Sequence, residues 1–388
     1  MRFREFVLKE SAAPTVGRKY QHVEDLIFTG IPSRGISPGV EAGQHAVRII
    51  KDMATQSKGQ NEIKWDGSPV VYWGKQDGVF YLIPKNAWEY LKRGKPQLDN
   101  GVKTAPTSAE EVSAFLLGTG KPDPEREAQR KQYAKQMASL WPYFEQASPE
   151  EGFLEGGLLF YPGTKPNGET AKPVLNKETG EYDFTPNITG FHIGKDSDLG
   201  RRIKFAKVMV AATGYYESLG SSDEGRYPNP EELSTNDTIV QGTVYVESAP
   251  GIDESLVDDA ESFINNNGQA INAFLSPKPG LSKVGEVLYK FYNQNLRVAG
   301  VKQKFIDWAN QNLSAPQAKK IISDPGLDAI LSAVEKLSVA KLDMYQRASS
   351  GTHSGIRQTK PEGYVYKDPD TDQFVKAISQ ADWAPRKD

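Results

Sequence analysis

The chain of 388 residues contains no cysteine, which excludes a disulfide framework and thiolate metal sites. Its few histidines form no pair with metal-ligand spacing, which argues against a zinc site: His22, His45, His192 and His353. No run approaches the ~20 apolar residues that a membrane span needs. The first residues are charged rather than continuously apolar, so we expect no secretory signal. These absences favour a soluble protein of a reducing cytoplasm with no membrane partner.

An excess of charge of one sign is also absent. The net charge is −3, so any binding of nucleic acid must come from a local basic surface rather than from a global field. The best candidate for such a surface is the group Lys195, Arg201, Arg202, Lys204 and Lys207, although a helix with basic residues is more often a solvated face. The 38% apolar and 25% charged content is typical of a globular protein.

Hydrophobic periodicity predicts a mixed α+β chain, and the length predicts roughly two to three domains. Helical spacing occurs at 19–29, 39–57 and 123–147, and strands are expected at 61–65, onward to about 95, and at 153–162, 182–193, 206–216 and 238–247. From 252 to 348 the period is helical, with segments 256–274, 283–295, 302–312 and 329–347 separated by Pro277, Pro279, Pro316 and Pro325.

One short motif carries the strongest indication of chemistry. Glu62-Ile63-Lys64-Trp65-Asp66-Gly67 places a lysine at the end of an apolar strand, two positions before an Asp-Gly turn. A lysine held at a strand end can attack a phosphorus atom once its amine loses the proton, and a tight turn keeps the backbone close to a phosphate. A Lys-x-Asp-Gly turn also closes many surface hairpins, so the motif alone does not decide the function.

A second motif lies near the other end of the chain. Pro361-Glu362-Gly363-Tyr364-Val365-Tyr366-Lys367 is followed, after a polar turn, by the short strand Phe374-Val375-Lys376-Ala377-Ile378. In this order, the two regions resemble the ATP-dependent DNA and RNA ligase superfamily of covalent nucleotidyltransferases. The resemblance implies an antiparallel nucleotidyltransferase fold of two packed sheets. Residues 1–250 would form the first part of the core, 251–349 an inserted helical domain, and 350–388 the closing strands.

The resemblance also implies roles for individual residues, with ATP and Mg²⁺ as cofactors. Lys64 would attack the α-phosphate of ATP to form lysyl-AMP, and AMP would then pass to a nucleic-acid end. Glu362, with Glu155 or Asp66, would hold the metal; Glu62 would face the adenine; Asp66 and Gly67 would form the turn at the nucleotide; Lys85 would bind ribose or acceptor phosphate; Phe191 or Tyr215 would stack on adenine; and Lys367 and Lys376 would contact phosphates.

The chain departs from the family pattern at two positions. Gly157 stands where the third motif of the family has a glutamate, and Glu155, two positions earlier on the same strand face, could supply the carboxylate. Ile378 stands where the last strand of the family usually has a second lysine, which leaves Lys376 alone. These departures leave open a non-catalytic binding or structural module that has kept the fold.

The substrate remains open between RNA and DNA ends, and an acceptor other than nucleic acid is a further alternative. Only about a dozen residues follow Ile378, too few for the barrel that follows the last core strand of DNA ligases, which slightly favours RNA ends. The helical region 252–348 is expected to be separable from the core and to contact the acceptor strand. The segments Glu24–Ile27 and Asp196–Gly200, together with the Lys64 motif, also resemble a set of tailed-phage proteins, which would place the chain in a host cytoplasm.

Overall fold

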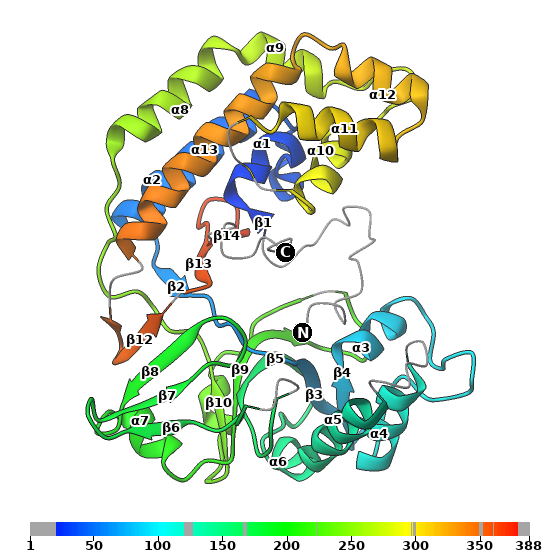
Figure 1. Cartoon of the computed structure of the whole chain (residues 1–388), viewed down its shortest axis with the longest axis vertical. Coiled ribbons are helices and arrows are strands. Elements are labelled where there is room, and N and C mark those ends of the chain that lie inside the picture. Colours follow the sequence, from blue (N-terminus) through cyan, green and yellow to red (C-terminus); the bar gives the residue numbers. More distant parts are fainter. Residues whose placement is uncertain are drawn as a thin grey trace. The chain divides into compact units, whose positions relative to one another are not determined.

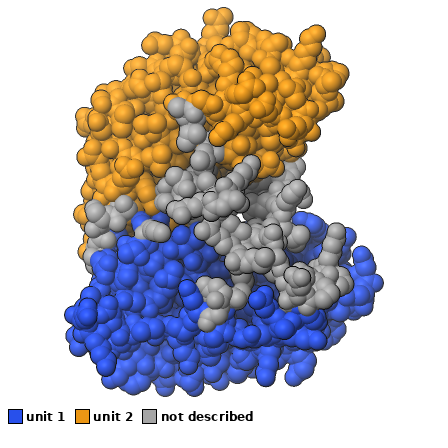
Figure 2. All heavy atoms as spheres, in the orientation of Figure 1, with its two compact units in different colours: residues 1–10, 65–244, 352–361 blue, residues 11–64, 245–351, 362–388 orange. Residues whose placement is uncertain are grey.

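A computed structural model describes residues 21–378 except 120–126, 166–168, 223, 296, 298–299, 349–351 and 360. The chain divides into two compact units, coloured blue and orange in Figure 2. Unit 1 takes in Trp65–Val244 and Thr352–Pro361, and unit 2 takes in the described residues of Ser11–Lys64, Tyr245–Gly351 and Glu362–Asp388. These units differ from the predicted division into a core with a helical insertion, because the helices share one unit with Lys64 and with the closing strands.

Unit 1 is built on a sheet with the strand order β10-β9-β5-β3-β4 (Figure 1). Its strands are β3 (Val70–Gln76), β4 (Val79–Pro84), β5 (Gly152–Phe160), β9 (Val208–Tyr216) and β10 (Thr238–Gln241). All neighbours are antiparallel except β10 and β9. Alternation along β3 sends Val71 and Trp73 into one buried cluster and Tyr72 into another, so both faces of the sheet are covered.

A second sheet of unit 1 has the order β11-β12-β8-β7-β6. It consists of β6 (Val174–Asn176), β7 (Glu181–Phe184), β8 (Gly190–Gly194), β11 (Thr352–His353) and β12 (Ile356–Thr359). The helices of unit 1 are α3 (Lys85–Lys92), α4 (Ala109–Gly118), α5 (Glu127–Ser139), α6 (Trp141–Gln146) and α7 (Asp198–Ile203). The expectation of strands to about 95 is therefore wrong at α3. The helix predicted at 123–147 is two helices over its described part.

Unit 2 contains the sheet β1-β14-β13-β2, formed by β1 (Gln21–His22), β2 (Asn61–Ile63), β13 (Gly363–Lys367) and β14 (Phe374–Ile378). Its helices are η2 (Val23–Asp25), α1 (Leu26–Thr29), η3 (Pro32–Arg34), α2 (Val40–Thr55), α8 (Glu254–Asn266), α9 (Gly268–Leu275), α10 (Val284–Tyr292), α11 (Lys302–Asn312), α12 (Ala315–Ile322) and α13 (Leu327–Ala348). The long helix α13 packs against α8, α2 and β14. The C-terminal helices therefore bury their apolar faces against the N-terminal ones.

The prediction of an α+β chain is confirmed, but the described residues form three sheets rather than two. Predicted helices at 39–57, 302–312 and 329–347 are confirmed within one or two residues at most ends. Pro316, predicted to lie between helices, instead lies in the first turn of α12, where its missing N–H is tolerated. No described helix is long and apolar enough to cross a membrane.

Candidate active site

The sheet of unit 2 brings together the three segments that carry the ligase-like motifs. β13 pairs with β2 on one side and with β14 on the other, both antiparallel. Its register aligns one residue from each of the four strands in a single row: Glu62, Val365, Lys376 and His22. Because opposed residues of a sheet point to the same face, the charged members of the row share one face. Lys64 continues this face beyond β2, and its backbone N–H donates to the carbonyl of Gly363 over 3.0 Å.

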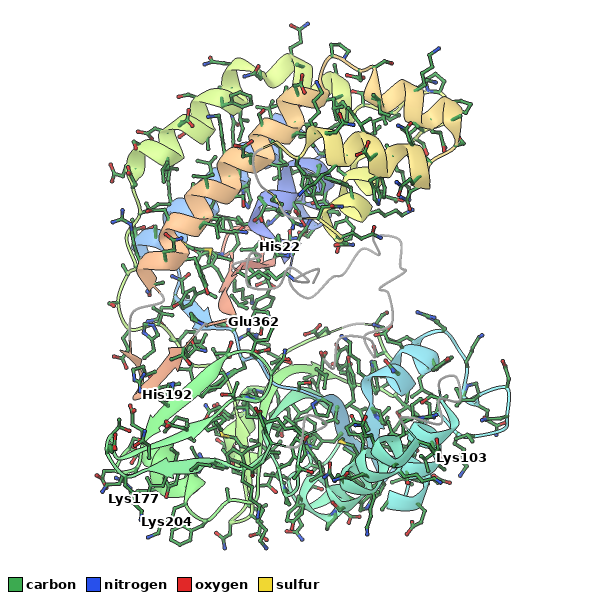
Figure 3. The ribbon with its side chains drawn as sticks, viewed as in Figure 1. His22, Lys103, Lys177, His192, Lys204 and Glu362 are labelled. Atoms are coloured by element: carbon green, nitrogen blue, oxygen red, sulfur yellow. The ribbon has the colours of Figure 1, made fainter. Side chains whose placement is uncertain are left out.

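Lys64 forms an ion pair with Glu362, the residue that precedes β13. Figure 3 labels this glutamate within unit 2. The lysine side chain keeps 20% of its surface exposed and the glutamate side chain 8%, so the lysine side chain is the more open of the two to solvent. The two residues lie 298 positions apart in the sequence, and pairing of β2 with β13 joins them. A nucleophile candidate and a metal-ligand candidate are thus adjacent.

Lys376 is the second amine of this face. Burial, followed by the positive charge of Lys64, lowers the pKa of Lys376 from 10.5 to about 8, and Glu362 opposes the shift. The side chain is only partly exposed. An anion bound against these two lysines would relieve their mutual repulsion, which is the electrostatic condition that a phosphate site needs.

His22 lies opposite Lys376 on β1, and its importance was missed by sequence reasoning. Burial, followed by the charge of Lys376, lowers its pKa well below 6.5, so the imidazole is neutral near pH 7. Its Nδ1 atom has no hydrogen-bond partner among the described residues and lies 3.8 Å from Glu24 Oε1. In the sequence, His22 is distinguished only by its position shortly before the Glu-Asp-Leu-Ile segment. That position does not predict the pairing of β1 with β14, which places His22 opposite Lys376.

A buried ionic network lies next to this row. Lys341 on α13 donates to Glu24 over 2.5 Å. Arg297 makes a two-pronged pair with Asp25, with N–O distances of 2.8 and 2.7 Å. All four side chains are at most 3% exposed, so each charge depends on its partner for solvation. The network ties η2 to α13 and to the segment after α10, and thereby fixes the residues that follow β1.

Asp66 belongs to unit 1 and has a structural role. Its carboxylate is 3% exposed. It accepts hydrogen bonds from the Asn187 side chain over 2.8 Å and from the backbone N–H groups of Ile188 and Thr189 over 2.7 and 2.8 Å. These bonds hold the loop that leads into β8. The predicted roles of Asp66 in nucleotide or metal binding do not fit, because protein donors occupy both of its oxygens.

The backbones of Gly67 and Gly157 lie so close together that neither position has room for a side chain. A Cβ atom on Gly67 would lie 2.5 Å from the carbonyl of Gly157, and a Cβ on Gly157 would lie 2.8 Å from the Cα of Gly67. The segment after Gly67 is fastened to β5 by the Ser68 N–H, which donates to the Leu158 carbonyl over 2.8 Å. The backbone of the turn therefore occupies the space where a glutamate at 157 would begin. Gly157 is required by packing, and the sequence alone could not show this.

Glu155 also lies in unit 1, on β5. It accepts a hydrogen bond from the Tyr216 hydroxyl over 2.8 Å and also hydrogen-bonds Tyr72, which lies opposite it on β3. Burial and the charge of Glu155 raise the pKa of both phenols, which therefore remain protonated donors. Its predicted role as a metal ligand stays a prediction, and its contacts are those of a carboxylate satisfied by two tyrosines.

Phe191, predicted as an adenine platform with Tyr215 as the alternative, is a core residue. It is fully buried, with Phe184 stacked on it at 5.5 Å between ring centroids and Trp65 at 5.1 Å. Its ring therefore has no free face for a base, and this prediction is wrong. Tyr215 is only partly buried, and its ring contacts Tyr227 at 5.4 Å.

The two remaining predicted lysines are exposed. Lys85 is the first residue of α3 in unit 1, directly after β4. Lys367 ends β13 in unit 2, where its amine pairs with Asp372 over 2.5 Å and lies 5.7 Å from the ring centroid of Phe374. Both lie at a strand end, and their phosphate roles stay predictions.

One group of possible metal ligands falls outside the predicted set. Glu181 and Asp183 on β7 and His192 on β8 have ligand atoms within 4.8 Å of one another. The His192 ring and Asp183, opposed in the ladder, hydrogen-bond over 2.7 Å, and Arg357 pairs with Glu181 over 2.6 Å. Because an arginine already neutralises one of the two acids, we assign these groups to cross-strand pairing.

Comparison with known proteins found no matching family model, no matching curated protein and no matching solved structure. The assignment of a function therefore rests on the residues and their geometry.

Proposed function

We propose that the chain is an ATP-dependent nucleotidyltransferase that acts through a covalent AMP on Lys64, with polynucleotide ends as acceptors. The observation that carries the proposal is the convergence of Lys64, Glu362 and Lys376 on one sheet from three separate segments. The order of these segments along the chain agrees with the ligase resemblance. The pairing of β2, β13 and β14 supports the proposal independently, because the short motifs alone do not require their strands to be neighbours.

The first reaction would break the bond between the α- and β-phosphates of ATP. The unprotonated Lys64 amine attacks the α-phosphorus, a P–N bond forms, pyrophosphate leaves with the bonding electrons, and the nitrogen gives up one proton to solvent. Lys376, which faces the same side of the sheet, would neutralise phosphate charge as it develops, and Glu62 would face the adenine. Catalysis of this kind depends on positioning and charge rather than on covalent chemistry by further groups.

Mg²⁺ fits the residues of this face. The cation is commonly held by one or two carboxylates together with substrate phosphates and water, and Glu362 supplies a carboxylate beside the reacting amine. When bound, the metal would offset phosphate charge. A cation held by Glu362 would compete with Lys64 for this carboxylate.

In the second half of the reaction, AMP would pass from Lys64 to a 5′-phosphate, and a 3′-hydroxyl would displace it to join two ends. RNA ends are slightly favoured over DNA ends by the resemblance. A nucleotidyltransferase with another acceptor would share the first half-reaction only. A non-catalytic module would show neither half.

The test is to incubate the full chain with α-labelled ATP and Mg²⁺, denature it, and measure the label that remains bound. Wild type should retain label and Lys64→Ala should retain none. Lys58→Ala removes a lysine of the same unit that pairs with Asp370 at the surface, and it should label like wild type. Absence of label on the wild type would overturn the proposal and favour the non-catalytic alternative.

A further inference from the structure

The segment from β8 through α7 to the start of β9 places an exposed aromatic ring among basic side chains. Phe205, two residues after α7, is 69% exposed, the largest exposed fraction of any large apolar side chain in the described residues. A phenylalanine ring left in water forgoes the favourable free energy of burying its apolar surface. A single exposed apolar residue needs no explanation by itself, so the inference depends on its neighbours.

Those neighbours are cationic. The amine of Lys204 lies 5.3 Å from the centroid of the Phe205 ring, which is cation–π distance. Five basic residues, named here the α7 basic surface, lie within thirteen positions: Lys195, Arg201, Arg202, Lys204 and Lys207. Figure 3 labels Lys204 in unit 1. The surface is thus locally positive on a chain whose net charge is −3.

Ion pairing does not cancel this charge. Within the described residues, Arg201 pairs with Asp198 and Lys207 pairs with Asp237 over 3.1 Å. For Lys195, Arg202 and Lys204 no carboxylate partner exists among the described residues. Asp196 is the further acid of the segment. The cations therefore exceed the carboxylates, and three remain available to an anionic partner.

The fold holds these residues firmly. The Ser197 hydroxyl caps α7 by accepting from the Gly200 N–H over 3.0 Å, and the Lys195 N–H donates to the Gly180 carbonyl over 2.9 Å. Val208, which follows the segment, is fully buried in β9. Phe205 lies in the turn between α7 and β9, where its backbone N–H donates to the Arg202 carbonyl over 3.1 Å. A ring on a backbone fixed in this way loses less conformational freedom when a ligand stacks on it.

We propose that the α7 basic surface together with Phe205 binds single-stranded nucleic acid, with Phe205 stacking on a base and Lys204, Arg202 and Lys195 contacting phosphates. Single strands are bound by exposed aromatic rings set among cations, because every base offers a π face and every linkage a negative charge. A duplex keeps its bases stacked and offers no such face. The inference extends the proposed function by naming the contact surface of its polynucleotide partner, but its geometry is independent of Lys64.

The test measures binding of the full chain to fluorescein-labelled oligo-U and oligo-dT of about 20 nucleotides by anisotropy over a salt series. Phe205→Ala should weaken binding about tenfold without changing the salt dependence, since it removes stacking alone. Lys204→Glu should also weaken binding and should lower the slope of log affinity against log salt by about one or more. Lys131→Glu, a 65%-exposed lysine on α5 of the same unit, is the matched control and should bind like wild type.

Equal binding by wild type, Phe205→Ala and Lys204→Glu would overturn the inference. So would wild-type binding to anionic phospholipid vesicles without binding to either oligonucleotide, because the surface would then serve a membrane. The labelling of Lys64 with AMP, measured on the same variants, separates the two proposals. Phe205→Ala should be labelled as well as wild type, because the ring takes no part in the reaction of Lys64. If wild type itself is not labelled, the proposed function is refuted, and the binding result is judged by the oligonucleotide measurements alone.

Discussion

Lys64 and Asp66 lie two residues apart in one motif, yet their side chains have opposite surroundings. The Lys64 amine is partly exposed among charged groups of unit 2, next to Glu362 and Lys376. The Asp66 carboxylate is buried in unit 1 and satisfied by three protein donors. The comparison teaches that a short motif can contain a reactive group and a scaffold group side by side. Removing Lys64 should therefore cost chemistry, and removing Asp66 should cost stability.

The largest expected effect is on the network that supports the Lys64 sheet. Lys341→Met leaves the fully buried Glu24 without its nearest cation, so we expect a loss of about 3–5 kcal/mol in the free energy of unfolding. Urea denaturation measures the loss. The double variant Glu24→Leu with Lys341→Met removes both charges and should recover most of it. If the single variant is as stable as wild type, the network does not hold unit 2 together.

Asp66→Ala tests whether Asp66 contributes more to the stability of the fold than Lys64 does. Three donors lose their acceptor in a buried place, so we expect a loss of about 3 kcal/mol in the free energy of unfolding. Lys64→Ala should lose only about 1 kcal/mol, since it removes one partly exposed partner of Glu362. Thermal or urea unfolding of both variants decides the matter. Equal losses, or a larger loss at Lys64, would contradict the division of roles.

Gly157→Ala tests whether packing requires the glycine. The new methyl group would meet the backbone of Gly67 at about 2.8 Å, so the turn after Asp66 must move. We expect a loss of about 2 kcal/mol in the free energy of unfolding, the usual cost of overpacking. Gly78→Ala would place its methyl group in open space, but the positive φ of 74° at that position adds strain. A better reference is Gly194→Ala, which has open space and no positive φ, and should be nearly neutral.

The smallest effect concerns pH. The pKa of Lys376 is about 8 in the folded chain against an ordinary 10.5, so the unfolded chain binds more protons between these values. Stability contributed at this residue therefore rises as pH increases from about 8 to 10.5 and is constant at its lower level below that window. Burial is the largest cause of the lowered pKa; among the charged groups, Lys64 and Arg297 add to the shift, and Glu362 and Asp25 oppose it.

Lys376→Met removes the titration, so wild type should gain melting temperature relative to this variant across that window. Lys58→Met, at a surface lysine paired with Asp370, is the control and should keep the pH dependence of wild type. A constant difference between wild type and Lys376→Met from about pH 8 to 10 would mean that Lys376 is an ordinary solvated lysine.

Local patterns predict much of the secondary structure. Apolar spacing predicts the helices found at 40–55 and 302–312, and the order of the three motifs agrees with the sheet that joins Lys64, Glu362 and Lys376. Local patterns could not predict the division into units. That division depends on burying N-terminal helices against C-terminal ones and on pairs such as Glu24 with Lys341, which lie 317 positions apart.

The errors at the site have similar causes. Phe191 is an aromatic residue on a predicted strand, as expected of a residue that stacks on a base. It is a core residue because Phe184 and Trp65 pack against its ring, and these contacts cannot be seen in the sequence. Gly157 resembles a missing acid in the sequence, because the close approach of Gly67 involves backbone atoms that a sequence does not display. The expectation that 252–348 is separable stays a prediction, and two contacts argue against it: α13 packs on β14, and its Lys341 pairs with Glu24.

The central claim is that Lys64 becomes covalently adenylylated, and peptide mass spectrometry tests it most directly. The wild-type chain is incubated with ATP and Mg²⁺ and digested, and the mass spectra of its peptides are searched for one that carries an added AMP. The account predicts that fragment ions place the AMP on Lys64. Folded Asp66→Asn should also carry AMP on Lys64, and Lys64→Arg should carry none. An AMP located on any other residue, or an unmodified Lys64 peptide in a folded chain that binds ATP, would contradict it.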